Sequence, residues 1–310
     1  MTNALLLPLL FMLLAPPGQE QDPFKISVNV RLVVLNATVR TRDKQFVKDL
    51  EKSSFEVYED GVKQSLTLFR HEDTPVTVGL VIDHSGSMRN KILDVIAAAR
   101  TFVSSSNPTD ELFVVNFNEH VVLGLPATEN FTSRSSELAS AIARTPTIGM
   151  TALYDAVARS LEQLRTGKFD KTALVVISDG GDNASKRALP EILQMLGETN
   201  TLLYSVGLFE PGDTDSNPGV LKKLAQATGG EAYFPKLEDV VGVCEGIARD
   251  IRSQYTLGYV STNVTGKPGT QRKIRVVAHR PDRTGPDQTG ADRTALIVRA
   301  RGGYIAAGSN

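Results

Sequence analysis

The sequence contains little cysteine and little net charge, and each shortage excludes a class of protein. Cys244 is the single cysteine among 310 residues, so no intramolecular disulfide can form. A zinc site built from four cysteines, or from two cysteines and two histidines, is excluded for the same reason. The 34 lysines and arginines nearly balance 35 aspartates and glutamates, which gives a formal net charge of -1. Without a basic surplus we expect no nucleic-acid partner and no attraction to an anionic bilayer.

Long apolar runs are also scarce, and the one that stands out is at the N-terminus. Residues 4–15 are mostly Leu, Phe, Met and Ala, and about a dozen apolar residues suit the h-region of a signal peptide but cannot span a bilayer. The first three residues carry no Lys or Arg, which leaves a misassigned start or a non-cleaved segment as alternatives. We predict a signal peptide at 1–21, a secreted or periplasmic location, and no transmembrane span in the mature chain.

The central part of the sequence, residues 74–253, alternates strand patterns with helix patterns, which is typical of a doubly wound α/β fold. Most of the strands are short and continuously apolar, as expected for strands covered on both faces. We therefore predict a mostly parallel six-stranded sheet whose edge strand, 121–125, runs antiparallel. The predicted strands are 76–82, 112–117, 121–125, 173–177, 202–206 and 231–234. The predicted helices are 89–105, 135–143, 153–164, 189–196, 218–227 and one that buries the Cys244 thiol.

The two flanks, residues 22–73 and 254–310, show β patterns instead. In the N-terminal flank, apolar residues alternate over 26–34, and Asp60-Gly61 between two apolar runs predicts a hairpin. In the C-terminal flank we expect strands at 255–260, 273–277 and 295–298, and a loop at 281–293. Neither flank has enough strands to bury a face alone. We predict that the flanks form one β-sandwich into which the α/β unit is inserted.

Polar side chains follow the first predicted strand of the α/β unit. Asp83, Ser85 and Ser87 stand at alternate positions, and Gly86 lets the backbone turn tightly between the serines. Ligands of an open parallel sheet bind at the carboxyl ends of its strands, which is where these residues fall. Three oxygen donors that converge there suit a hard divalent cation. A helix-capping role is the alternative for each of these residues.

Two further polar motifs occur in related places, and together the three resemble a known family. Thr151 stands just before a Leu-Tyr-Asp-Ala helix, and Ser178-Asp179-Gly180 follows a buried Val-Val-Ile strand. With the Asp-x-Ser-x-Ser motif at Asp83, this order resembles the metal-ion-dependent adhesion site of von Willebrand factor type A domains. The resemblance covers residues 74–252, and the flanks resemble those of exported bacterial proteins with a related domain. Capping explains neither Thr151 nor Asp179.

The resemblance implies a set of metal ligands and a function. Ser85, Ser87 and Thr151 would be the hydroxyl ligands, and Asp83 and Asp179 would hold the ion directly or through water. The ion would be Mg2+ or Mn2+, with Ca2+ as a further candidate, and would accept an Asp or Glu carboxylate from a protein partner. We therefore expect an adhesion or interaction module without catalytic residues. The sequence specifies neither the partner nor the oligomeric state.

Two other functions remain open at this stage. A Mg2+-dependent phosphatase-like hydrolase also has an aspartate at the end of its first strand, but the general acid expected two residues later is replaced here by Ser85. A structural subunit with a vestigial metal site is the second alternative. Asp155 and Asp182 are expected near the site as supporting or solvated groups rather than as ligands. For His84 we favour a solvent-facing ring without a role over a ring that tunes binding by its charge.

Overall fold

The computed structural model describes residues 32–71, 73–209, 216–263, 269–280 and 296–306. Its largest element is a six-stranded sheet with the strand order β10-β9-β8-β5-β6-β7. The strands are β5 (Thr77–Asp83), β6 (Glu111–Phe117), β7 (Val121–Leu123), β8 (Thr172–Ser178), β9 (Leu202–Gly207) and β10 (Ala232–Tyr233). Neighbours pair in parallel except β6 and β7, which pair antiparallel at the edge. The predicted sheet, including its antiparallel edge strand, is confirmed.

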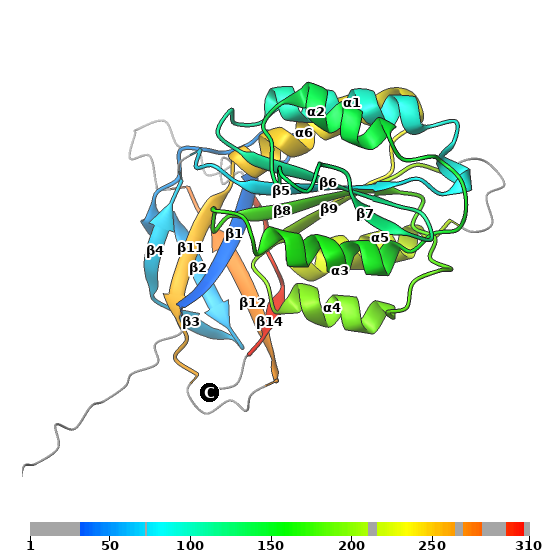
Figure 1. Ribbon diagram of the computed structural model, residues 1–310. Helices are drawn as coiled ribbons and strands as arrows, with labels where there is room; N and C mark the ends of the chain where they lie inside the picture. Colours follow the sequence, from blue (N-terminus) through cyan, green and yellow to red (C-terminus); the bar gives the residue numbers. More distant parts are fainter. Residues whose placement is uncertain (1–31, 72, 210–215, 264–268, 281–295, 307–310) are drawn as a thin grey trace, which may run out of the picture. The chain divides into compact units, whose positions relative to one another are not determined.

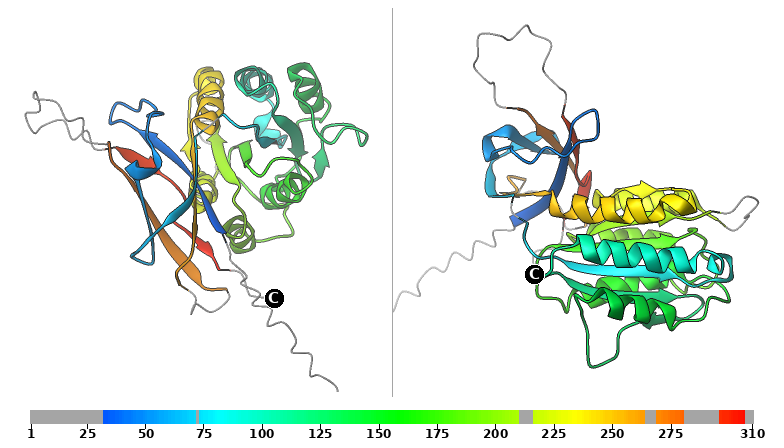
Figure 2. Two further views of the ribbon diagram at one scale, coloured as in Figure 1. Left: turned by 90° about the vertical axis from the view of Figure 1, so that its left-hand side faces the viewer. Right: turned by 90° about the horizontal axis from the view of Figure 1, so that it is seen from above.

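Helices cover both faces of this sheet. They are α1 (Ile92–Ser105), α2 (Ser135–Ala143), α3 (Leu153–Leu164), α4 (Leu189–Gly197), α5 (Pro218–Thr228) and α6 (Val240–Arg252). Figure 1 shows α1, α2 and α6 on one face and α3, α4 and α5 on the other, and Figure 2 gives the same layers from two further sides. Cys244 lies buried on α6, and burial raises the pKa of its thiol to about 12, so the thiol is an inert core group.

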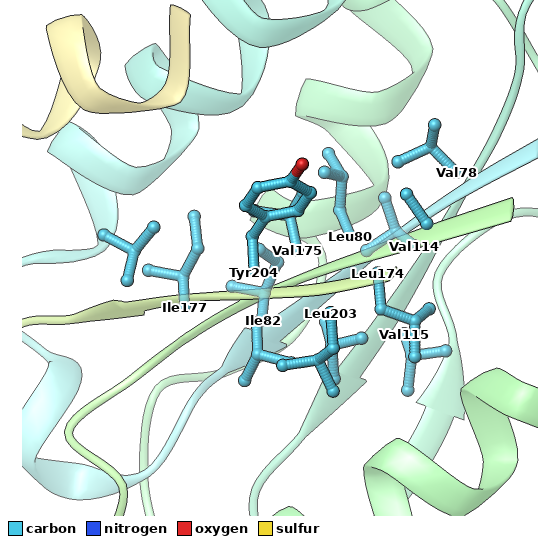
Figure 3. Packing of buried hydrophobic residues seen from close by; sticks show 14 of the residues in the cluster. Val78, Leu80, Ile82, Val114, Val115, Leu174, Val175, Ile177, Leu203 and Tyr204 are labelled. Atoms are coloured by element: carbon cyan, nitrogen blue, oxygen red, sulfur yellow. The ribbon is translucent and has the colours of Figure 1, made fainter. Parts of the chain in front are cut away.

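Side chains from both faces of the central strands form the main hydrophobic core. Tyr204 and Leu203 are neighbours on β9 and project to opposite faces, because side chains alternate along a strand (Figure 3). Close packing also requires one glycine. A Cβ on Gly79 would lie 2.4 Å from the Phe113 ring, so only glycine lets this ring lie against β5.

The flanks form two antiparallel four-stranded sheets, and each sheet combines strands from both ends of the chain. One has the order β13-β1-β11-β4 and the other β14-β12-β2-β3. The N-terminal strands are β1 (Leu32–Arg40), β2 (Phe55–Glu59), β3 (Val62–Gln64) and β4 (Leu66–Arg70). The C-terminal strands are β11 (Tyr255–Val260), β12 (Gln271–Ala278), β13 (Ile297–Arg299) and β14 (Gly303–Ile305). Buried residues of both sheets share a second core, which includes Leu35, Val57, Tyr255 and Leu257. The sandwich predicted from the two flanks is therefore confirmed.

Three details of the sequence interpretation need correction. The alternation predicted over 26–34 overlaps β1 only at its start, because β1 continues to Arg40 and buries Val33, Leu35, Ala37 and Val39, whereas Leu32 is exposed. The second arm of the hairpin is split after Gln64, because β3 pairs with β2 in one sheet and β4 pairs with β11 in the other. Helix α1 begins at Ile92, because residues 86–88 form a separate 3-10 turn. The predicted signal peptide and the 281–293 loop lie outside the described residues.

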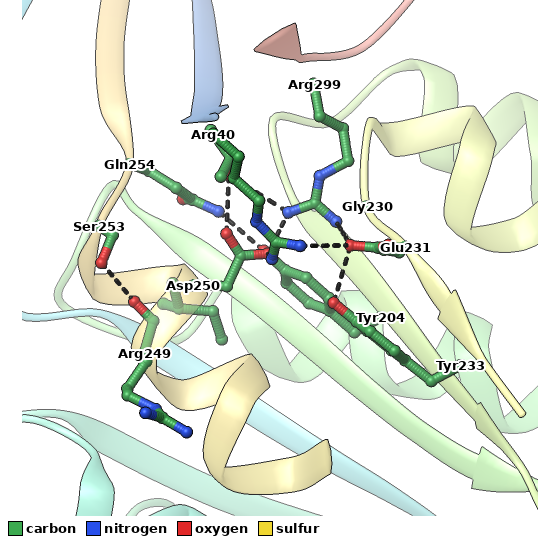
Figure 4. Close-up of polar contacts among 12 residues, drawn as sticks. Arg40, Tyr204, Gly230, Glu231, Tyr233, Arg249, Asp250, Ser253, Gln254 and Arg299 are labelled. Carbon is green, nitrogen blue, oxygen red and sulfur yellow. Dashed lines mark hydrogen bonds and ion pairs between the residues drawn. The ribbon is translucent and has the colours of Figure 1, made fainter. Parts of the chain in front are cut away.

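A buried ion network joins the sandwich to helix α6. The Asp250 carboxylate on α6 is fully buried, accepts a hydrogen bond of 2.8 Å from the Thr38 hydroxyl on β1, and pairs with Arg299 on β13. Arg299 also donates to Glu231 at 2.8 Å, and Arg40 on β1 lies 3.5 Å from Asp250. Figure 4 shows these groups converging. Because a buried charge is costly unless it is paired, the network ties α6 to both flanks.

Candidate metal centre

Three loops meet at the carboxyl edge of the six-stranded sheet and line a cleft of about 500 Å³. The first follows β5, the second precedes α3 and the third follows β8. Four of the five predicted ligands line this cleft, namely Ser85, Ser87, Thr151 and Asp179. The fifth, Asp83, ends β5 and is fully buried. All five residues therefore come together, although 96 positions separate the first from the last.

Asp83 is held by two hydrogen bonds at the base of the site. One carboxylate oxygen accepts from the Ser85 backbone amide at 2.8 Å, and the other accepts from the Ser178 hydroxyl at 2.6 Å. Ser178 is the last residue of β8, which pairs directly with β5. The parallel register therefore brings this hydroxyl beside Asp83 and fixes the orientation of the carboxylate.

Asp179 and the two serines form the next layer of the site. The Ser87 hydroxyl donates to the Asp179 carboxylate, and the Ser85 and Ser87 hydroxyl oxygens are 3.1 Å apart. The other Asp179 oxygen accepts from the Gly181 amide at 3.0 Å. Gly180 adopts φ +82°, and a Cβ there would lie 2.5 Å from the Asn217 carbonyl oxygen. A glycine is therefore required for the turn that presents Asp179.

Thr151 is positioned through its backbone. Its amide donates to the Asn183 side chain at 2.8 Å, and its carbonyl accepts from the Asn183 amide at 2.9 Å. The preceding turn is fixed by Glu119, whose carboxylate accepts from the Met150 amide at 3.0 Å. Gly149 adopts φ +88°, and its carbonyl oxygen accepts a hydrogen bond from the Gly86 amide at 3.1 Å. This contact ties the turn that bears Thr151 to the turn that bears Ser85 and Ser87.

The electrostatics of the site are those of two carboxylates without a countercharge. Asp83 is 0% exposed and Asp179 is 2% exposed. Within the described part of the chain, neither forms an ion pair with Lys, Arg or His. Burial raises the pKa of Asp83 to about 6, and the charge of Asp179 contributes in the same direction. Two buried carboxylates and three hydroxyls are an all-oxygen donor set with a charge deficit, which fits a divalent cation.

The capping alternative for the β5 motif is wrong. Lys91 is the N-cap of α1, Ser85 is the N-cap of the preceding 3-10 turn, and neither side chain caps its helix. Among the described residues no group of three or more His, Cys, Asp or Glu side chains is arranged to hold a metal. Any cation site on this edge therefore depends on hydroxyl donors.

The neighbouring acidic residues support loops. Asp155 accepts from the amides of Lys186 and Arg187, at 2.9 and 3.2 Å. Asp182 lines the cleft and accepts from the Tyr154 amide at 3.1 Å and from the Ser185 hydroxyl at 2.6 Å. Both carboxylates are therefore engaged in holding the loop after β8 against the start of α3.

The expectation for His84 is wrong, because its ring is fully buried. The ring nitrogens lie 3.3 Å from the Thr147 hydroxyl and 3.2 Å from the Asn116 side-chain oxygen, and burial lowers the pKa of His84. Sequence reasoning also missed the positioning roles of Ser178, Asn183 and Glu119. Their signal was modest: Ser178 ends β8, Asn183 lies in the loop that follows it, and Glu119 lies in the short turn between β6 and β7.

Comparison with known proteins identifies the domain. Residues 78–181 match the family model of the von Willebrand factor type A domain, and the fold and motif order agree with this match. The chain contains a von Willebrand factor type A domain. No curated protein matches the chain significantly.

Solved structures with a similar fold extend this finding. A von Willebrand factor type A protein from Catenulispora acidiphila is 15% identical, with 88% of this chain and 74% of that chain covered and a TM-score of 0.52. Proximal thread matrix protein 1 from the mussel byssus, with a zinc-occupied MIDAS motif, is 13% identical over 62% of this chain and 49% of its own, with a TM-score of 0.50. The first similarity covers more of the chain than the α/β unit, so the fold likeness includes flanking strands.

Proposed function

We propose that this chain is an exported, divalent-cation-dependent protein-binding module. Asp83, Ser85, Ser87, Thr151 and Asp179 would hold Mg2+ or Mn2+, or alternatively Ca2+. The partner would present an Asp or Glu carboxylate to the cleft. Export is supported by the apolar run at residues 4–15. In the described part of the chain, no helix is long and apolar enough to cross a membrane.

The observation that carries this proposal is the buried pair Asp83 and Asp179. Two nearby carboxylates out of water repel each other, and one of them takes up a proton unless a cation is present. A chain that needed only stability would place an apolar pair or an Arg partner here. This argues against a vestigial site, because a bound cation allows both carboxylates to stay ionised and offsets the cost of burying them.

The residues that line the cleft would leave one coordination position of the ion open to a partner. When bound, the ion supplies a positive centre that attracts an external anion. The hydroxyls of Ser85, Ser87 and Thr151 contribute no negative charge, so the ion keeps its electrophilic character. Ser87 is exposed, and Thr151 lies at the wall of the cleft. A partner carboxylate can therefore approach from solvent.

The same donor set favours binding over hydrolysis. A phosphatase of this architecture needs a carboxylic acid two residues after Asp83, and Ser85 does not donate a proton at neutral pH. The Asp155 and Asp182 carboxylates accept hydrogen bonds within the loop after β8. A metal site without a free acid, base or nucleophile is a binding site. The zinc-occupied MIDAS motif of the mussel byssus protein supports a divalent ion on this fold.

A peptide array tests the proposal. Peptides with a central Asp or Glu are compared with matched Asn or Gln peptides, each in Mg2+ and in EDTA. Binding should require both the carboxylate and the cation, and Asp83→Asn should abolish it. Asp182→Asn is the matched control, because it removes a carboxylate from the same cleft without removing a proposed ligand. Binding that persists in EDTA would contradict the proposal.

A further inference from the structure

A second pocket, which shares no lining residue with the metal centre, lies where the chain passes between the sandwich and the α/β unit. Its volume is about 350 Å³, and it is lined by Lys48, His71, Asp73, Arg249 and Arg252. Lys48 is on the loop after β1, His71 and Asp73 are on the link from β4 to β5, and both arginines are in the last turn of α6. Residues of the sandwich loop, of the link from β4 to β5 and of the end of α6 therefore line the same pocket.

The charge of this pocket is positive and only partly compensated. Asp73 is its one carboxylate, and it is engaged by the Arg252 side chain at 2.7 Å. Arg249 has Glu245 at 3.8 Å, with side chains 60% and 43% exposed, a surface pair of little strength. Within the described residues the Lys48 amine forms no ion pair. Three cations facing one carboxylate leave a net charge of about two positive on the pocket wall.

Tyr255 holds the parts of this pocket in place. Its ring stacks on His71 with 4.0 Å between centroids and 20° between planes. Its hydroxyl donates to the Val47 carbonyl at 2.9 Å and accepts from the Leu50 amide at 3.1 Å. The loop that carries Lys48 is thus pinned on both sides of that residue. Arg252 is fixed by Asp73 and by the Ser105 carbonyl at 3.2 Å. Preorganised donors lose less entropy when an anion binds.

We propose that this pocket binds a doubly charged oxyanion of the phosphate class. Such an anion matches the uncompensated charge, and Arg guanidinium groups are well suited to several phosphate oxygens at once. It would link Lys48 on the sandwich side to Arg249 and Arg252 on α6. The proposal is independent of the metal centre, because no residue is shared between the two sites.

His71 provides a direct reporter. Burial lowers the pKa of this imidazole, and the charges of Lys48 and Lys171 lower it further, while Asp49 raises it. Asp73 and the two α6 arginines line the same space. An anion among these cations would favour the protonated ring and so raise the pKa of His71. The chain has four histidines, so the ring signals can be resolved and His71 assigned with a His71→Asn variant.

The experiment follows the four histidine rings by NMR against pH in the full chain, with EDTA present and ionic strength held constant with chloride. Sulfate at millimolar concentration, which presents the same tetrahedral oxyanion and stays doubly charged across this pH range, should raise the pKa of His71 by about one pH unit and leave the exposed His120 and His279 unchanged. Lys48→Ala combined with Arg249→Ala should weaken sulfate binding at least about tenfold. Lys236→Ala, which removes an exposed lysine elsewhere, should have no effect.

Three results would overturn the proposal. The first is a pKa of His71 that does not respond to sulfate, and the second is a response that survives in the double variant. The third is an equal response to acetate at the same concentration, which would show that a singly charged carboxylate suffices. Both substituted side chains are exposed, so the double variant is expected to fold, and its melting temperature verifies this.

Discussion

Ser87 and Asp179 are 92 residues apart in the sequence, and the hydroxyl of Ser87 donates a hydrogen bond to the carboxylate of Asp179. The contact joins the loop after β5 to the loop after β8. These two strands are neighbours in the sheet. An exposed serine and a buried carboxylate thus share the entrance of the cleft. In the proposed function both oxygens would turn to the same cation.

Metal should stabilise the folded chain. An ion present at a concentration of about 100 times its Kd stabilises the folded state by about 2.7 kcal/mol. For a domain of this size, that raises Tm by about 5–10 °C. We expect this rise with Mg2+ or Mn2+ and its loss in Asp83→Asn, measured by calorimetry. Asp182→Asn should retain the rise. A wild-type Tm that is unchanged by millimolar metal would contradict the ligand assignment.

Thr151 and Asp179 should differ in what they contribute. Asp179→Asn removes a charged ligand and should weaken Mg2+ binding at least about tenfold, as measured by calorimetric titration. Thr151→Ala removes a neutral hydroxyl at the cleft wall. It should weaken binding of carboxylate peptides more than binding of the metal. Equal losses of metal affinity in the two variants would leave a static site in which Thr151 has no separate role.

Lys171 should give the stability a pH dependence on the alkaline side. Burial lowers the pKa of Lys171 to about 8 in the folded chain, whereas it is about 10.4 in the unfolded chain. Between these values the unfolded state binds more protons, so the contribution of Lys171 to stability rises with pH and is lost as pH falls through 8. Denaturation of wild type and Lys171→Met should show this rise between pH 8 and 10 only in wild type. Parallel profiles would refute it.

Removal of the C-terminal strands should unfold the N-terminal ones. Strand β1 lies between β11 and β13, and β2 lies between β12 and β3. A chain that ends at Ser253 therefore leaves β1 without either neighbour and removes Tyr255 and Leu257 from the second core. We expect proteases to cut within 32–70 while the α/β unit stays folded. Protection of 32–70 from hydrogen exchange in that chain would contradict the shared sandwich.

The sequence predicted most of the fold because its signals were local. Continuous apolar strands and periodic helices identify a covered sheet, and Asp60-Gly61 correctly located a turn. The end of β1 was missed because Val33, Val34 and Leu35 are consecutive apolar residues that interrupt the alternation, although the strand continues to Arg40. The division of this segment into β3 and β4 after Gln64 was missed, because a strand that passes from one sheet to another keeps the same residue pattern.

The sequence predicted which residues come together at the candidate site, but it did not predict the groups that position them. Asp83, Ser85 and Ser87 share one motif, so spacing alone brings them together. Ser178 reaches Asp83 only through the β5–β8 register, which is a tertiary property. His84 was expected in solvent because its neighbours are polar. Its burial follows from Asn116 on β6 and Thr147, which lie far away in the sequence.

The most direct measurement is anomalous diffraction from a crystal of the full chain grown or soaked with Mn2+. We predict one strong anomalous peak in the cleft, within about 2.0–2.5 Å of oxygens from Ser85 and Ser87 and close to Asp83, Thr151 and Asp179. The peak should vanish in Asp83→Asn crystals prepared in the same way. A cleft without a peak at millimolar Mn2+, or a peak that persists in the variant, would contradict the assignment of these five residues as a metal centre.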